Sequence, residues 1–509
     1  MIQRLCAIIA LALLATGCAV NPVTGKNEIM IYSDQAQIAM GAEQFIPGQQ
    51  SQGGLYSIDP ELTAYINSVG QRIAAHSDAA LPYEFVVLNN SVPNAWALPG
   101  GKIAVNRGLL TELNSEAELA AVLGHEIIHA AARHGAKRIQ TGLAFQTLVV
   151  TTAIASKDSQ YSNYYVGGAQ LITQLFGSKY GRDAEREADY YGMQYMVRAG
   201  YDPKAAVSLQ ETFVRLSEGR DSNWLAGWFA SHPPSQERVD NNSATAEQLK
   251  VDGETGAERY QQQLARLRDR QPAYDAFDKA YREIAKGDLE AAMSLTNQAI
   301  LREPKEARFH GLKGDIYLEQ KRYRAARAAY DDALARDNNY YEYYLGRGLA
   351  YSQLNQRAEA KRDLEKSNTL FPTSIANNEL GKMALAAGNR AVAKNYFQVA
   401  ASAPDAVGKE ALASFITLDL PENPARYLKA NAGLSDDRRL YAQVGNQSPF
   451  IVRQLQVVFE ARVNGQNIQR SVNLYNLQPG TTSTALSGWQ FKAEDQVDGY
   501  RAYVTSPRL

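Results

Sequence analysis

Residues 125–129 read His-Glu-Ile-Ile-His and decide how the rest of the chain is interpreted. They lie inside a run of alanine, leucine and isoleucine. Ser115 followed by Glu118 is a capping-box pattern and predicts that one helix covers residues 115–139. Because residues four apart share one face of a helix, the two imidazoles can approach the same point. A buried histidine pair requires a polar or ionic partner at that point.

The spacing predicts a zinc site with His125 and His129 as ligands. Glu126, next to the first ligand, is placed to act as general base on a water molecule. The chain contains only 6 histidines, so a chance match to this pattern is rare. A catalytic zinc site needs a third protein ligand and one open position, whereas a structural site usually closes all four with Cys or His. The structural alternative is therefore disfavoured.

Candidates for the third ligand lie in residues 181–189, which read Gly-Arg-Asp-Ala-Glu-Arg-Glu-Ala-Asp. Glu185 and Asp189 are four apart and share a helix face, whereas Glu187 points elsewhere. One carboxylate could bind zinc while the other holds a ligand histidine by its outer nitrogen. Periodicity alone leaves open which does which.

His134 is expected to be structural, because it follows His129 by five residues and is therefore predicted to lie off the ligand face. His76 and His310 are expected at the surface. Residues 46–55 and 157–168 are predicted loops from their Gly, Pro and polar content, the second being either a lid or a plain connection.

The composition indicates several globular domains. A chain of 509 residues is too long for one ordinary core and predicts two to four domains. Hydrophobic residues make up 45% and the formal net charge is -1. No global field therefore favours a nucleic-acid partner.

The N-terminus reads as a secretory signal over residues 1–18, with a short apolar segment from Ile8 to Ala15. Its end resembles a bacterial lipoprotein cleavage box, in which Cys18 is lipidated. Ala19 after it implies a lipid anchor in the outer membrane, facing the periplasm. Cys6 and Cys18 are the only 2 cysteines, so the mature chain would have no disulfide. The alternative is an uncleaved N-terminal anchor.

A repeat with a period of 34 residues begins near residue 273. Small residues recur at its interval in three columns: Ala280, Gly314, Gly348, Gly381; Ala292, Ala326, Ala360, Ala393; and Ala299, Ala333, Ser367, Ala400. This is typical of tetratricopeptide repeats, in which each unit is a pair of antiparallel helices. We predict four units within residues 270–410; the alternative, an ordinary helical bundle, does not explain three aligned columns.

The flanking regions differ in character. Residues 240–270 are charged and Gln-rich and form the candidate boundary between a domain at 19–255 and the repeats. Residues 435–509 alternate short apolar stretches with turns such as Asn464-Gly465, which predicts a small β-sandwich.

Several motifs together resemble the M48 family of zinc metallopeptidases, in its periplasmic lipoprotein subgroup with C-terminal tetratricopeptide repeats. They are the Glu-x-x-x-Asp element that follows His-Glu-x-x-His by some 55 to 60 residues, Asn-Pro-Val-Thr-Gly-Lys at 21–26, Asn-Ala-Trp-Ala-Leu-Pro-Gly-Gly at 94–101, and His-Pro-Pro at 232–234 followed by Arg238. The resemblance covers about residues 20 to 240. It implies a multidomain, mainly α chain: a gluzincin-type α+β metallopeptidase domain, an α-helical repeat solenoid and a small C-terminal β-sandwich.

The resemblance also implies roles for individual residues. Glu185 becomes the third zinc ligand and Asp189 the group behind it. His232 becomes either a helper for the oxyanion or a gate at the open zinc position, and Arg238 pins the His232 loop. The strand near Ile103 would pair with the backbone of an extended substrate.

The implied function is a zinc metalloendopeptidase that cleaves unfolded or misassembled envelope proteins. The repeats would bind clients or an outer-membrane protein assembly complex. The alternative is a latent protease that acts mainly as a repeat-based adaptor or chaperone in envelope protein assembly.

Overall fold

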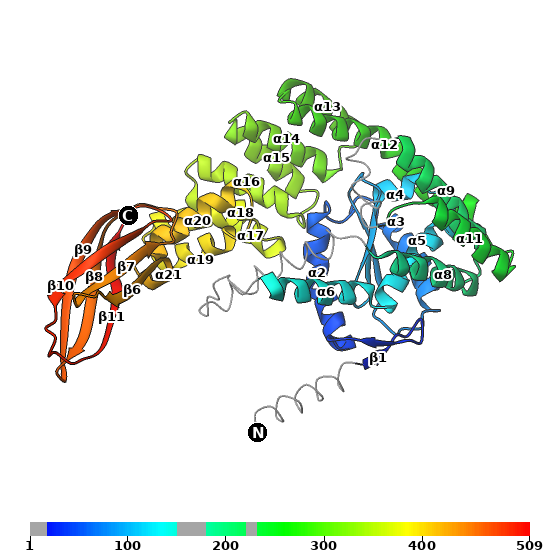
Figure 1. Ribbon diagram of the computed structural model, residues 1–509. Helices are drawn as coiled ribbons and strands as arrows, with labels where there is room; N and C mark the ends of the chain where they lie inside the picture. The colour runs from blue at the N-terminus through cyan, green and yellow to red at the C-terminus, as the bar shows by residue number, and fades with distance from the viewer. Residues whose placement is uncertain (1–17, 150–179, 220–231) are drawn as a thin grey trace. The chain divides into compact units, whose positions relative to one another are not determined.

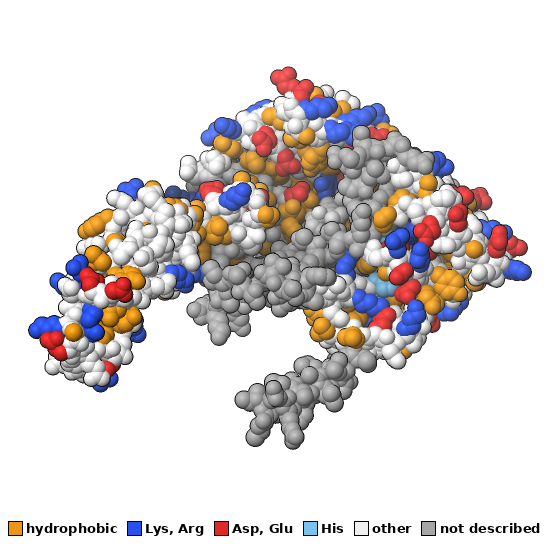
Figure 2. Space-filling model, in the orientation of Figure 1, with side chains coloured by type: hydrophobic (Ala, Val, Ile, Leu, Met, Phe, Trp, Pro, Cys, Tyr) orange, Lys and Arg blue, Asp and Glu red, His pale blue; other side chains and the backbone are white. Residues whose placement is uncertain are grey.

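The computed structural model describes residues 18–149, 180–219 and 232–509 (Figure 1). The predicted loop at 157–168 and most of the predicted signal at 1–18 lie outside these ranges. The chain divides into two compact units between Phe371 and Pro372. Within the described ranges, no helix combines the length and apolar character needed to cross a bilayer. Acidic and basic side chains are interspersed on the face shown in Figure 2, in keeping with the formal net charge of -1.

The first unit contains a buried three-stranded sheet. Its strands are β3 (Glu84–Leu88), β4 (Ala95–Leu98) and β5 (Lys102–Asn106), in the order β3-β5-β4. Ile103 in β5 is paired with a parallel strand on one side and an antiparallel strand on the other. The prediction that the strand near Ile103 pairs with substrate is therefore wrong, because both of its edges are used. β4 is an edge strand of this sheet, and it packs next to the helix that carries His125.

Both faces of this sheet are buried, because apolar side chains occupy alternate positions on both sides. One face packs against α3 (Pro60–Ala74) and α5 (Glu116–Ala131); the other packs against α2 (Asp34–Ser51) and α6 (His134–Val149). The first core contains Phe85, Val87, Ala95, Ala97, Ile103 and Val105 of the sheet, and the second contains Val86, Leu88, Trp96, Leu98 and Ala104.

Helix α2 corrects one prediction. Part of the expected loop at 46–55 is helical, since α2 continues through Pro47 to Ser51. Gln50 is 1% exposed; its amide donates to the Asn339 carbonyl at 2.7 Å and accepts from the Tyr341 amide at 2.8 Å. These contacts span almost 300 residues of sequence, so local Gly and Pro content could not predict them.

The predicted helix at 115–139 is broken after the zinc-binding pattern. α5 ends at Ala131, and α6 begins at His134 after Arg133 adopts a left-handed conformation with φ of 61°. The Arg133 guanidinium donates to the Val20 carbonyl at 3.1 Å and pairs with Asp34 at 2.9 Å. Contacts from the N-terminal segment therefore stabilise a backbone conformation that arginine rarely adopts.

The start of α5 follows the prediction. The Ser115 hydroxyl accepts from the Glu118 amide at 3.1 Å. The Glu118 carboxylate accepts from the Asn114 amide at 2.7 Å, one residue earlier than in the usual capping box. The first turn of the helix is thus capped and buried.

Helix α8 (Arg182–Arg198) lies against α5 at a pair of glycines. A Cβ on Gly124 would lie 3.0 Å from the Gly192 carbonyl oxygen, and a Cβ on Gly192 would lie 3.0 Å from the His125 amide nitrogen. The absence of side chains at both positions lets the helices approach closely. This contact places the N-terminal turns of α8 beside the histidines of α5.

The long helix α12 (Ala257–Ala285) has one end in the core of the sheet region and the other in the repeats. The predicted limits at 255 and 270 stay predictions, since the contact pattern divides the chain at Phe371 and not within α12. The other helices that the structure describes in the first unit are α4 (Arg107–Glu112), α9 (Lys204–Gly219), α11 (Gln236–Leu249), α13 (Leu289–Arg302), α14 (Ala307–Glu319), α15 (Tyr323–Leu334), α16 (Tyr341–Gln353) and α17 (Arg357–Leu370). A short ribbon of β1 (Cys18–Val20) and β2 (Asn27–Ile29) begins the described chain.

The repeat helices pair as the 34-residue period predicts. A Cβ on Gly314 would meet the Tyr330 ring at 2.6 Å, and one on Gly381 would meet the Phe397 ring at the same distance. The small-residue column therefore marks where the paired helices touch. In the second unit the helices are α18 (Ser374–Ala386), α19 (Arg390–Ala400), α20 (Ala406–Asp419) and the short α21 (Pro424–Tyr427).

The C-terminal strands form two antiparallel sheets of three strands each, in the orders β10-β7-β6 and β11-β8-β9, around one apolar core. The strands are β6 (Leu428–Leu434), β7 (Arg439–Asn446), β8 (Val452–Val463), β9 (Gln466–Leu477), β10 (Thr482–Gln490) and β11 (Val497–Arg508). Asn464 and Gly465 both have positive φ in the β8–β9 turn, as the hairpin prediction required.

Candidate metal centre

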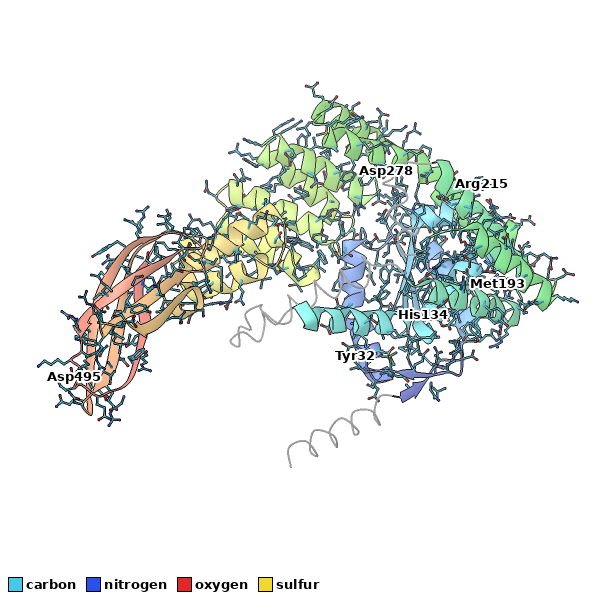
Figure 3. All side chains as sticks on the ribbon, in the orientation of Figure 1. Tyr32, His134, Met193, Arg215, Asp278 and Asp495 are labelled. Atoms are coloured by element: carbon cyan, nitrogen blue, oxygen red, sulfur yellow. The ribbon has the colours of Figure 1, made fainter. Side chains whose placement is uncertain are left out.

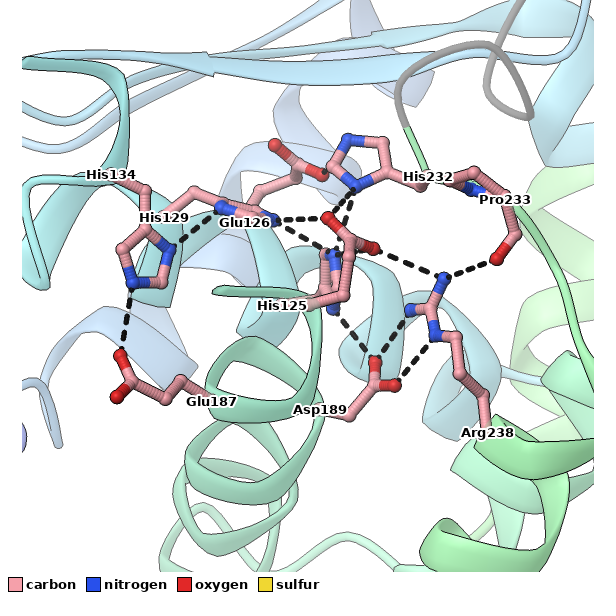
Figure 4. A network of polar contacts seen from close by, with 10 residues as sticks. His125, Glu126, His129, His134, Glu187, Asp189, His232, Pro233 and Arg238 are labelled. Atoms are coloured by element: carbon pink, nitrogen blue, oxygen red, sulfur yellow. Dashed lines mark hydrogen bonds and ion pairs between the residues drawn. The ribbon is translucent and has the colours of Figure 1, made fainter. Parts of the chain in front are cut away.

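Four buried side chains converge between α5, α8 and the segment before α11 (Figure 4). They are His125, His129, Glu185 and His232, and one ligand atom from each lies within 4.8 Å of all the others. Their exposed fractions are between 1% and 4%. Three come from the helix faces that sequence periodicity identified, and the fourth comes from the His-Pro-Pro segment.

The inner nitrogen atoms of the two α5 histidines face each other, with His125 Nε2 3.0 Å from His129 Nε2. A Glu185 oxygen lies 3.4 Å from His129 Nε2, and the other lies 3.6 Å from His125 Nε2. His232 Nδ1 lies 2.9 Å from Glu185 Oε1 and 3.2 Å from His125 Nε2. Inner nitrogens and a carboxylate that meet at one point fit the donor set of a zinc ion.

The outer nitrogen atoms of the same histidines have other partners, which supports the metal fit. His125 Nδ1 lies 2.9 Å from Asp189 Oδ1. His129 Nδ1 lies 2.9 Å from His134 Nδ1, and His134 Nε2 lies 3.2 Å from a Glu187 oxygen. With the outer nitrogens held in this way, the inner Nε2 atoms are the ones directed to a metal.

Arg238 ties the carboxylates to the His232 segment. Its guanidinium donates to both oxygens of Asp189 at 2.7 Å each, and it lies 3.1 Å from a Glu185 oxygen. It also donates to the Pro233 carbonyl at 3.4 Å. The expectation that Arg238 holds the His232 loop agrees with this contact, and its links to both acids were not foreseen.

Glu126 is fully buried beside this cluster. Neither of its carboxylate oxygens has a hydrogen-bond partner among the residues that the structure describes. His232 Nε2 lies 3.6 Å from Glu126 Oε1. Burial raises the pKa of the Glu126 carboxyl above its ordinary value, which makes it a better proton acceptor.

The surroundings shift the pKa of all three ligand side chains. For His129 and Glu185 the shift favours the form that binds a metal, whereas for His125 it favours the protonated imidazole. Burial lowers the pKa of His129 well below its usual value, which favours the neutral form that a metal requires. For Glu185, burial raises the pKa, but the charge of His232 and hydrogen bonds from His129 and His232 outweigh it, so the pKa falls well below the ordinary range. For His125, burial lowers the pKa, but Asp189 and Glu185 together raise it above the usual value.

Sequence reasoning did not predict two ring contacts of His129, which are made by Tyr180 and His134. The Tyr180 ring stacks on His129 with centroids 3.9 Å apart, and the Arg138 guanidinium lies over the same Tyr180 ring, 4.3 Å from its centroid. His134 was predicted to lie off the ligand face, and it does lie off that face of α5, yet its ring contacts His129. His310 was predicted at the surface and is 7% exposed, since its Nε2 bonds to the Pro304 carbonyl at 3.0 Å.

Comparisons with known proteins agree with this geometry. Residues 60–246 match Peptidase family M48, and residues 307–340 and 341–374 match the tetratricopeptide repeat. A beta-barrel assembly-enhancing protease of Yersinia pestis is 26% identical over 381 residues, which is 69% of this chain and 77% of that protein. The Escherichia coli K12 protein of the same name is 30% identical over 220 residues, 40% of this chain and 45% of that protein. The mitochondrial metalloendopeptidase OMA1 of Schizosaccharomyces pombe is 39% identical over 181 residues, 35% of this chain and 51% of that protein.

The fold and the buried cluster define a zinc metallopeptidase domain. More narrowly, the chain carries a peptidase domain of family M48 followed by tetratricopeptide repeats. The match to the Escherichia coli and Schizosaccharomyces pombe proteins spans about half of their own length.

Proposed function

We propose that the chain is an endopeptidase that hydrolyses unfolded or misassembled envelope proteins. The observation that carries the proposal is the convergence of two imidazole nitrogens and a carboxylate beside the Glu126 carboxylate, which has no hydrogen-bond partner among the described residues. His125, His129 and Glu185 would hold one zinc ion. When bound, zinc supplies a Lewis acid that makes water a stronger acid and withdraws charge from a carbonyl oxygen.

Glu126 performs the proton transfer. Its carboxylate takes a proton from the attacking water and delivers it to the leaving amine of the cleaved peptide bond. Asp189 keeps His125 in the tautomer that exposes Nε2, because its carboxylate accepts a hydrogen bond from the protonated Nδ1 of His125. Both roles depend on the buried, low-dielectric setting of the cluster.

His232 has two candidate roles, oxyanion helper and gate. Its Nδ1 lies within 2.9 Å of the Glu185 carboxylate and 3.2 Å of His125 Nε2, inside the ligand cluster. A side chain in that position takes up the space that water or a substrate carbonyl needs. The geometry therefore favours the gate, in which the His232 segment withdraws before substrate binds.

The substrate backbone would pair with β4 as an additional strand. β4 is an edge strand next to α5, whereas β5 has no free edge. Pairing through main-chain hydrogen bonds reads little side-chain sequence and suits unfolded polypeptides. The repeats would bind clients or an outer-membrane protein assembly complex, and a lipid on Cys18 would hold the chain at the outer membrane, facing the periplasm.

A second function keeps the same residues. The position of His232 in the ligand cluster also suits a latent protease that acts mainly as a repeat-based adaptor or chaperone. Retention of the cellular role by Glu126→Gln would establish the adaptor, and its loss would establish hydrolysis as the main task.

The proposal is tested by cleavage of a purified, unfolded protein by the native chain. We expect hydrolysis that stops with a chelator and returns when zinc is added. His232→Ala should cleave faster if His232 is a gate and slower if it helps the oxyanion, with His76→Ala as a control outside the cluster. A zinc-loaded native chain and His232→Ala that both leave the unfolded protein intact would contradict the proposal.

A further inference from the structure

His134 begins α6, the helix that follows the zinc-binding pattern (Figure 3). In one continuous helix, a residue five positions after His129 would point about 140° away from it. The break at Ala132 and Arg133 turns the chain so that the His134 ring comes back to His129. The ring centroids are 5.0 Å apart, with an interplanar angle of 72°.

The contacts of His134 form a chain of three groups that ends on His129. His134 Nδ1 lies 2.9 Å from His129 Nδ1, and His134 Nε2 lies 3.2 Å from Glu187 Oε2. The other Glu187 oxygen lies 3.7 Å from Lys26 Nζ. His134 is 5% exposed, so water does not compete freely for these bonds.

Only one arrangement of protons suits these contacts when His129 offers Nε2 to a metal. Nδ1 of His129 must then carry the proton and donate it. Nδ1 of His134 must accept, so its own proton resides on Nε2 and is donated to the Glu187 carboxylate. His125 differs, since its Nδ1 meets the Asp189 carboxylate directly.

We propose that His134, with Glu187 behind it, is a positioning residue for His129. It fixes the tautomer and ring orientation in which His129 directs Nε2 toward the metal. The inference rests on the proposed zinc site. The two histidine ligands are then held differently. Asp189 holds His125 directly, whereas Glu187 holds His129 through the His134 imidazole.

The turn that delivers His134 is held from the N-terminal segment. The Asn21 amide donates to the Ala132 carbonyl at 3.4 Å, and Arg133 donates to the Val20 carbonyl at 3.1 Å. Lys26, which contacts Glu187, belongs to the same segment. Residues 20–26 thus support both the turn and the end of the chain of contacts.

The test measures zinc affinity of the full-length chain by competition with a chelator. His134→Leu removes the acceptor and should weaken zinc binding by about 10–100-fold, the usual effect of losing a partner of a histidine ligand. His134→Asn places an amide oxygen near the position of Nδ1 and should restore most of the affinity. Glu187→Gln should give a smaller loss, and His310→Leu, a buried histidine elsewhere, should give none.

A second readout is the visible absorption spectrum of the cobalt-substituted protein, which reports ligand geometry and not only folding. We expect the spectrum to change in His134→Leu and to return toward native in His134→Asn. Equal zinc affinity and equal spectra for native protein and His134→Leu would overturn the inference, as would an asparagine variant no better than leucine. If His134→Leu does not fold, an unchanged zinc affinity in Glu187→Gln would overturn it.

Failure of the proposed function would look different. A native chain that binds zinc tightly and cleaves no unfolded protein would contradict the hydrolysis. The affinity ranking of the four variants would still decide the role of His134.

Discussion

Two polar clusters in the first unit, one buried and one partly exposed, differ in how their charges are matched. In the repeats, Arg347 donates to both oxygens of Asp363 at 2.7 and 3.0 Å and to Asp331 at 2.8 Å. In the peptidase region, histidine nitrogens face one another, and the Glu126 carboxylate has no hydrogen-bond partner in the described ranges. The repeat cluster is complete as it stands, whereas the other needs a cation. The functional site is marked by donor atoms that converge on one point beside an acid with no hydrogen-bond partner among the described residues, and not by polarity alone.

The largest expected effect is a loss of peptide hydrolysis with the zinc ligands unchanged. Glu126→Gln should reduce the rate of peptide hydrolysis by about 10²–10⁴-fold, because an amide cannot accept the proton of water. Zinc content should stay native. Initial rates on an unfolded protein, with Glu118→Gln on the same helix as the control, measure this. A rate within a factor of about three of native would remove Glu126 from the mechanism.

The next largest effect is a loss of zinc affinity caused by a substitution outside the three ligands. Asp189→Asn removes the carboxylate that accepts from His125 and pairs with Arg238, so zinc affinity should fall by about 10–100-fold. Asp183→Asn, an exposed acid at the start of the same helix, is the control. Chelator competition would measure both, and equal affinities would show that Asp189 does not orient His125.

A substitution in the repeat cluster should lower the stability of the protein and leave its zinc affinity unchanged. Arg347→Met leaves the buried Asp363 and the partly exposed Asp331 without their partner and should lower the free energy of unfolding by about 2–3 kcal/mol. The exposed Arg362→Met should lower it by less than about 0.5 kcal/mol. Urea unfolding gives these values. A loss of zinc affinity in Arg347→Met would show that the two clusters are not independent.

The smallest effect depends on pH. Burial, followed by the charge of Glu342, raises the pKa of Asp315 to about 7. An acid whose pKa is higher in the folded state favours folding at low pH, and this contribution is lost as pH rises from about 4 to about 7. Asp315→Asn should therefore stabilise the protein at pH 8 by about 2 kcal/mol and by much less at pH 4.5.

Urea unfolding of the native chain and Asp315→Asn at the two pH values measures this difference, with the exposed Asp332→Asn as the control. The same difference at both pH values would mean that Asp315 titrates normally.

Local patterns predicted the parts of the site that lie on single helices. The i, i+4 spacing places His125 with His129 and Glu185 with Asp189, because helix periodicity is a property of a few residues. The 34-residue period predicted the helix pairs because its small residues recur where the paired helices touch. Which carboxylate faces the inner nitrogens depends on the approach of α5 and α8 at Gly124 and Gly192, and the motif resemblance supplied that assignment.

Contacts between distant segments account for the wrong predictions. The end of α5 depends on Val20 and Asp34, so the run of good helix formers after His129 predicted a helix that continues. The order of the sheet, which buries both edges of β5, depends on pairings that no single strand encodes. Gln50 extends α2 through a contact with the third helix pair of the repeats.

We propose that His125, His129 and Glu185 together bind the zinc ion. Anomalous diffraction at the zinc edge, from crystals of the native chain grown without added zinc, tests it most directly. We predict one strong anomalous peak, about 2 Å from His125 Nε2, His129 Nε2 and a Glu185 oxygen. A peak at another place, or none at this one in a protein that contains one zinc per chain, would contradict it.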